Sequence, residues 1–113
     1  MKYKIAIVGS RGLKVDVAVY VPPEYCEKII SGGAVGIDSC AREFAHKYNI
    51  PLTEHLPQYD IYGKQAPLVR NKLIVNDADI VVGFWDGNSR GTMHTIDYAR
   101  KMGKRVKLYK LKV

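Results

Sequence analysis

The stretch from Ile29 to Asp38, I-I-S-G-G-A-V-G-I-D, limits what this chain can fold into more than any other. It predicts the end of a buried strand, a turn with three glycines and the start of a helix. Gly32, Gly33 and Gly36 permit positive φ angles and lack the Cβ atoms that would hold a ligand away. The unpaired N–H groups of the helix point back at this turn, which therefore suits phosphate or another anion. The spacing matches neither G-x-G-x-x-G nor a Walker A loop, so a tight packing turn is the alternative.

Strands and helices alternate along the chain. Apolar, β-branched runs predict five strands, at residues 3–8, 26–30, 51–56, 79–85 and 106–111. Helical periodicity predicts helices at 36–48, 68–76 and 93–102. In residues 13–23 the valines at 15, 17, 19 and 21 alternate as in a strand, but we favour a short irregular helix capped by Asp16. We therefore expect one α/β domain over residues 1–113, with a mainly parallel five-stranded sheet in the order 3-2-1-4-5, flanked by helices.

Three strand ends open into turns rich in glycine and serine, at Gly9, Ser31 and Trp85. In a parallel sheet they emerge at one edge, and in the order 3-2-1-4-5 the first and fourth strands flank the point where the winding reverses. Ligands of open α/β sheets bind there. The three turns are therefore expected to form one cleft, with Arg11 as a candidate anion contact or else a surface arginine. Asp38 is expected either to cap its helix or to orient a ribose hydroxyl or the glycine turn.

Residues 56–67 form a connection that is long for so small a domain, and such loops are often functional. Tyr59 and Tyr62 lie there beside Lys64, an arrangement that suits stacking of a base next to its phosphate. The alternative is that both tyrosines cover the sheet. Arg70 follows early in the next helix, where a cation opposes the helix dipole, and this placement indicates a role with a partner.

Composition narrows the class of partner. The chain carries 18 Lys and Arg against 11 Asp and Glu, and the net charge of +7 favours anionic partners such as nucleotides or nucleic acid. No run approaches the roughly 20 apolar residues of a membrane span, and the basic start predicts a first strand rather than a signal peptide, so a cytoplasmic protein is expected. Cys26 and Cys40 are expected to be buried, reduced thiols. Neither they nor the three histidines show metal or triad spacing, so we expect no metal, no cofactor and no catalytic residue.

Several motifs, taken in order, resemble one family. They are G-S-R at 9–11, S-G-G-A-V-G-I-D at 31–38, R-N at 70–71, F-W-D-G-N-S-R-G-T at 84–92 and G-K at 103–104. Together they resemble the SLOG superfamily of Rossmann-like domains, and within it the small YspA/DUF2493-type proteins. Similar motifs occur in the DprA/Smf proteins, which bind single-stranded DNA, and in the LONELY GUY phosphoribohydrolases, which cut the N-glycosidic bond of nucleoside monophosphates.

This resemblance implies a Rossmann-like domain with a pocket for a nucleotide or nucleotide-derived ligand. The ligand-binding residues that it and the strand-end argument predict come from all three turns and from the helix that carries Arg70. They are Gly9, Ser10, Arg11, Ser31, Gly32, Gly33, Gly36, Asp38, Arg70, Asn71, Trp85, Asp86, Ser89, Gly91 and Thr92.

One departure from the family bears on activity. The hydrolase branch has P-G-G-x-G-T-x-x-E, whose glutamate stabilises the transition state, and the matching position here is Thr95. Threonine cannot supply that carboxylate, so we expect ligand binding or sensing without chemistry. Single-stranded nucleic-acid binding of the DprA type and a nucleotide N-glycosidase are the alternatives. We also expect a homo-oligomer, with the exposed face of the last helix and strand as its candidate interface.

Overall fold

A five-stranded, all-parallel sheet in the order β3-β2-β1-β4-β5 forms the centre of the protein, as predicted. The structure, a computed structural model, describes residues 1–112. The strands are β1 (Tyr3–Gly9), β2 (Cys26–Ser31), β3 (Leu52–Glu54), β4 (Ile80–Trp85) and β5 (Arg105–Lys110). The third strand is shorter than the predicted 51–56, because it lies at the edge of the sheet and pairs with only three residues of β2.

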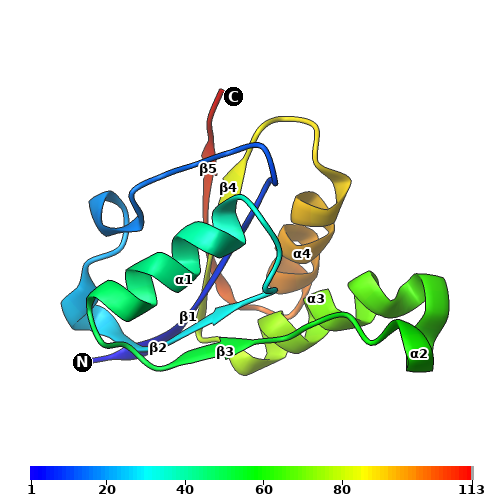
Figure 1. Cartoon of the computed structure of the whole chain (residues 1–113), viewed down its shortest axis with the longest axis horizontal. Coiled ribbons are helices and arrows are strands. Elements are labelled where there is room, and N and C mark those ends of the chain that lie inside the picture. Colours follow the sequence, from blue (N-terminus) through cyan, green and yellow to red (C-terminus); the bar gives the residue numbers. More distant parts are fainter. Residues whose placement is uncertain (113) are drawn as a thin grey trace.

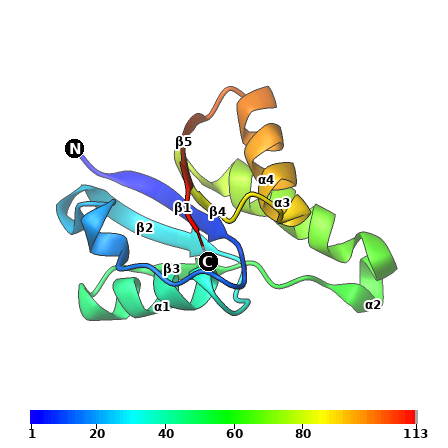
Figure 2. The same ribbon diagram turned by 90° about the horizontal axis from the view of Figure 1, so that it is seen from above.

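Helices cover both faces of the sheet (Figure 1). Helix α1 (Ile37–Lys47) lies on one face, and α3 (Ala66–Asp77) and α4 (Arg90–Lys101) lie on the other, as the view from above shows (Figure 2). The remaining helical pieces are short: α2 (Tyr59–Tyr62) and the 3-10 turns η1 (Val17–Val19), η2 (Pro23–Tyr25) and η3 (Gly63–Gln65).

The expected short helix within residues 13–23 is present as η1. The side chain of Asp16 accepts a hydrogen bond from the N–H of Ala18 at 3.2 Å, as predicted for its cap. A carboxylate at this position satisfies an N–H group that the first turn leaves without a helical partner.

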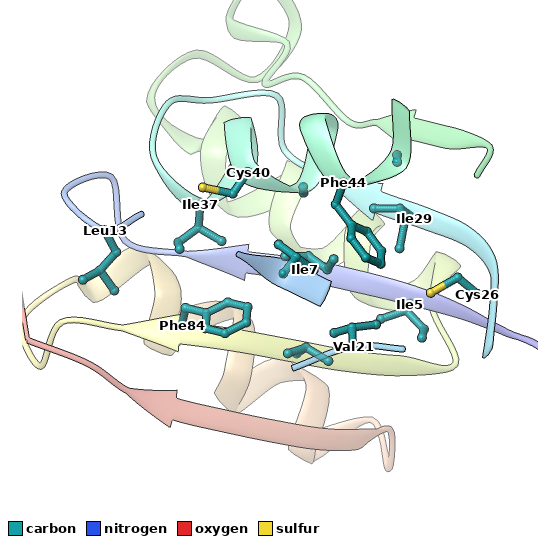
Figure 3. Packing of buried hydrophobic residues seen from close by; sticks show 14 residues of the cluster. Ile5, Ile7, Leu13, Val21, Cys26, Ile29, Ile37, Cys40, Phe44 and Phe84 are labelled. Carbon is teal, nitrogen blue, oxygen red and sulfur yellow. The ribbon is translucent and has the colours of Figure 1, made fainter. Parts of the chain in front are cut away.

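Alternate residues of β1 supply two separate cores. Ile5 and Ile7 pack with α1 and η1 on one face, whereas Ala6 and Val8 pack with α3 and α4 on the other. Figure 3 shows the first of these cores, with Phe44 of α1 above the sheet. A central parallel strand buried on both faces reads as an unbroken apolar run, which is why the period-2 alternation of a half-exposed strand is missing from the sequence.

The connection between β3 and α3 is more ordered than a loop, because it contains α2 and η3. Helix α2 projects away from the sheet at one end of the molecule (Figures 1 and 2) and buries none of its residues. Tyr59 and Tyr62 are 59% and 43% exposed, so the alternative that they cover the sheet is wrong. Both have an aromatic ring open to solvent.

Cys26 and Cys40 are free thiols in the first core, as predicted. Within residues 1–112, no helix is both long enough and apolar enough to cross a membrane.

Candidate functional site

A cleft of about 430 Å³ opens where β1, β2 and β4 end. Its walls come from the turns after these strands, from the first turn of α1 and from the N-terminal halves of α3 and α4. The lining residues are Val8, Gly9, Arg11, Gly12, Gly32, Ala34, Asp38, Pro67, Leu68, Arg70, Asn71, Ile74, Asp86, Ser89, Gly91, Thr92 and Thr95.

Ser10 ties the three turns together from beneath the cleft. Its N–H donates to the carbonyl of Phe84 at 3.0 Å, and its hydroxyl accepts from the N–H of Asp86 at 3.1 Å. Its carbonyl accepts from the N–H of Ile37 at 3.5 Å, at the start of α1. The residue is 1% exposed. Ser10 therefore holds the ends of β1 and β4 and the first turn of α1 in one arrangement.

Gly36 brings the glycine turn against the turn after β1. Its φ is +74°, and a Cβ here would overlap the backbone carbonyl of Arg11. A residue with a side chain would therefore be strained by its backbone conformation and excluded by the neighbouring chain. The sequence predicted the need for a glycine at this position, but it did not show that the neighbouring group is the backbone of Arg11.

Arg70 reaches across the cleft to the glycine turn. Its Nη1 donates to the carbonyl of Gly32 at 2.9 Å and its Nε donates to Oδ1 of Asn71 at 3.0 Å. Burial lowers the pKa of Arg70, an effect that the nearby Asp38 and Tyr59 oppose. These two bonds use two of the five guanidinium N–H groups, so the fixed side chain keeps donors for a ligand.

Asp38 lies on the same wall as Arg70 and is only 9% exposed. Its Oδ2 accepts from the N–H of Ala34 at 3.1 Å, which closes the glycine turn. Burial raises the pKa of this carboxyl, against the lowering effects of that N–H, of the Ser31 hydroxyl and of Arg70. The ion pairs within residues 1–112 lie elsewhere, between Lys28, His55 and Asp77 and between Arg42 and Glu54.

The turn before α4 is built around two polar caps. Oδ1 of Asp86 accepts from the N–H groups of Asn88 at 2.8 Å and Ser89 at 2.9 Å, and these two bonds hold the pKa of Asp86 below its usual value. The hydroxyl of Ser89 accepts from the N–H of Thr92 at 3.3 Å. The other N–H groups of this first helical turn, including that of Gly91, have no partner inside the helix. Gly91 and Thr92 of this turn line the cleft.

The structure brings ten of the fifteen predicted site residues into the lining of the cleft: Gly9, Arg11, Gly32, Asp38, Arg70, Asn71, Asp86, Ser89, Gly91 and Thr92. The other five support this lining from behind. Ser10, Gly33 and Gly36 shape the turns, and Trp85 donates from Nε1 to the carbonyl of Ser89 at 3.0 Å. The hydroxyl of Ser31 is fully buried beside Asp38, whose pKa it lowers, although no atom of the described residues meets it in hydrogen-bond geometry.

Sequence reasoning did not identify several lining residues. Pro67 and Leu68 bring apolar surface from the first turn of α3, and Gly12 and Ala34 extend the two glycine-containing turns. The only sequence signal for these four residues is that each lies next to, or within three positions of, a predicted site residue: Arg11, Gly33 or Arg70. Thr95 is 2% exposed and donates its hydroxyl to the carbonyl of Gly91 at 3.1 Å, so the predicted position of the hydrolase glutamate does lie in the wall of the cleft.

One comparison with known proteins, that with solved structures, bears on the fold. No family model matches the chain. The Gene 61 protein of Mycobacterium phage D29 is 31% identical in an alignment of 81 residues, and the match covers 66% of this chain and 65% of the phage protein. The structure of DNA processing protein A (DprA) from Streptococcus pneumoniae superposes on 99% of the chain with a TM-score of 0.77 and 20% identity. The chain thus has the Rossmann-like fold of DprA and spans about half, 52%, of its length.

Proposed function

We propose that this protein binds a nucleotide or nucleotide-derived ligand in the cleft, with a phosphate at the first turn of α4 and no chemistry of its own. The observation that carries this proposal is the convergence of the N-terminal ends of α1 and α4 on one cleft. Each end contributes free N–H donors and a positive dipole, which together favour an anion. A volume of about 430 Å³ lies within the range of small-molecule sites, roughly 300–1,000 Å³.

The charged side chains of the cleft support an anionic ligand. Arg70 is fixed by Gly32 and Asn71 and lines the cleft, and Arg11 lines the opposite turn. A guanidinium held in place loses little conformational freedom when it binds a phosphate, and it can bind two oxygens at once. We assign Arg70 as the main phosphate-binding side chain.

The threonine at position 95 supports binding without glycosidic hydrolysis. Its hydroxyl is occupied by the carbonyl of Gly91, and it offers neither a negative charge for an oxocarbenium-like transition state nor a base. Incubation with nucleoside monophosphates should therefore release no free base, which chromatography would detect.

Isothermal titration with AMP, ADP-ribose and a cyclic dinucleotide tests the proposal. We expect at least one of them to bind, and Arg70→Gln to weaken its binding by about 10- to 150-fold, since hydrogen bonds to charged groups contribute roughly 1.5–3 kcal/mol. Arg100→Gln is the matched control, because Arg100 is exposed in the last turn of α4 and outside the cleft. Absence of binding by all three at millimolar concentration would refute the proposal.

Single-stranded nucleic acid is the second candidate. The net charge of +7, the DprA-like fold and the exposed rings of Tyr59 and Tyr62 favour it. Binding along a strand would displace counterions, so log K for an oligo-dT should fall with log salt with a slope of about −0.7 for each phosphate contacted. A slope between about −1 and 0 for the oligo-dT, together with tighter binding of a mononucleotide than of the oligo-dT, would favour the cleft ligand.

A further inference from the structure

Asp38 is out of place in a site built for anions. The cleft is otherwise surrounded by arginines and helix N-termini, yet this carboxylate lines it and is 91% shielded from solvent, with a relative exposure of 9%. An ionised carboxylate only accepts hydrogen bonds, so it repels a phosphate and attracts a hydroxyl. Closing the glycine turn through Ala34 gives Oδ2 one backbone hydrogen bond, and the Ser31 hydroxyl lies beside the carboxyl. Two carboxylate oxygens have about four acceptor positions, so acceptor capacity remains for a ligand.

The acceptor of Asp38 and the donor of Arg70 lie side by side. The position that a Cβ of Gly32 would occupy is 3.0 Å from Oδ2 of Asp38 and 2.7 Å from Nη1 of Arg70. A ligand that reaches this wall therefore meets an anion-binding group and a hydroxyl-binding group within a few ångströms. A sugar phosphate with free hydroxyls presents both chemistries, whereas inorganic phosphate presents only the first.

We propose that Asp38 accepts hydrogen bonds from the 2′- and 3′-hydroxyls of a ribose, so that the cleft selects ribonucleotides over nucleotides that lack this diol. This inference rests on the proposed function and names the class of its ligand. It also separates the cleft ligand from single-stranded DNA, whose sugars carry no 2′-hydroxyl and use the 3′-oxygen in the backbone. Asp38 thus determines specificity, while Arg70 and the first turn of α4 hold the phosphate.

The test compares AMP with 2′,3′-dideoxy-AMP by titration calorimetry. We expect the native protein to bind AMP about tenfold or more tightly, because a hydrogen bond to a charged group is worth roughly 1.5–3 kcal/mol. In Asp38→Ala this ratio should fall to about one. Asp38→Asn keeps an acceptor for the Ala34 N–H and should give an intermediate ratio. It therefore serves as a second test if Asp38→Ala does not fold. Asp97→Asn, which changes an exposed carboxylate on α4, should leave the ratio unchanged.

The outcomes distinguish this inference from the function on which it depends. Equal binding of the two nucleotides by the native protein would overturn the role of Asp38 and leave nucleotide binding intact. The same conclusion follows if the ratio stays unchanged in both Asp38 variants while they remain folded by circular dichroism. If AMP, ADP-ribose and the cyclic dinucleotide all fail to bind, the proposed function fails and this inference fails with it.

Discussion

Replacing Gly32 with alanine should disable the cleft while it leaves the fold nearly intact. The added Cβ would stand 2.7 Å from Nη1 and 3.2 Å from Cζ of Arg70, and 3.0 Å from Oδ2 of Asp38. These contacts are too short to persist, and the atoms concerned are the ends of side chains. Gly32 is not among the residues with a positive φ, so alanine can adopt its backbone conformation.

The expected magnitude follows from the contact that must break. To make room, Arg70 has to give up its 2.9 Å hydrogen bond to the carbonyl of Gly32 and leave its place in the cleft. Loss of a correctly placed guanidinium should cost the ligand roughly 1.5–3 kcal/mol, or about 10- to 150-fold in Kd. The free energy of unfolding should change by less than about 1 kcal/mol, because the smaller entropy of the unfolded alanine chain offsets part of the loss.

Urea denaturation and titration with AMP measure the two effects on the same samples. Gly36→Ala is the contrasting variant, since its φ of +74° and the adjacent backbone of Arg11 leave no room for a side chain. It should lower the free energy of unfolding by about 2 kcal/mol or more. If Gly32→Ala binds AMP as tightly as the native protein, Arg70 does not hold the phosphate. If it unfolds as readily as Gly36→Ala, the two glycines do not have the separate roles described.

Three further predictions concern titratable groups. Burial raises the pKa of Asp38, so the ionised carboxylate opposes folding. Asp38→Asn should therefore have a higher urea midpoint than the native protein at pH 8. The difference should vanish below about pH 4, where the carboxyl is protonated in both the folded and the unfolded chain. Burial would raise the pKa of Asp77, but the hydrogen bonds with Lys28 and His55 outweigh it and lower that pKa. Asp77→Asn should therefore lower the free energy of unfolding at pH 7 by up to about 1 kcal/mol. The difference should disappear as the native carboxylate is protonated in acid, and a difference that persists there would contradict this cause. Burial raises the pKa of Cys26 to about 11, so a thiol reagent at pH 8 should modify it quickly only in urea, and rapid labelling of the native thiol would refute its burial.

The strand order could be predicted because it rests on patterns that survive in a single sequence. The unbroken apolar run from Ile5 to Val8 in β1 indicates a strand covered on both faces, which places it inside the sheet rather than at an edge. Glycine-containing turns after β1, β2 and β4 then indicate which end of the sheet carries the cleft. The edge strand β3 was harder to delimit, because pairing on one side only leaves few constraints on its length.

The turns that line the cleft could be predicted from the sequence, but the residues that hold those turns in place could not. A sequence cannot distinguish a residue that faces the cleft from one that orients its neighbour, and Trp85 is such a case, since its indole N–H binds the carbonyl of Ser89. The apolar contribution of Leu68 depends on how α3 packs against the sheet, which is a long-range property. The helical turn of α2 was also missed, because a four-residue helix has too few positions for a period to appear.

The hydrogen bonds of Ser10 have a consequence for the entropy of association. Since one buried residue already joins the backbones of three turns, an incoming molecule meets a rim whose main chain is preorganised. Binding then costs little entropy for ordering the loops, and more of the interaction free energy appears as affinity.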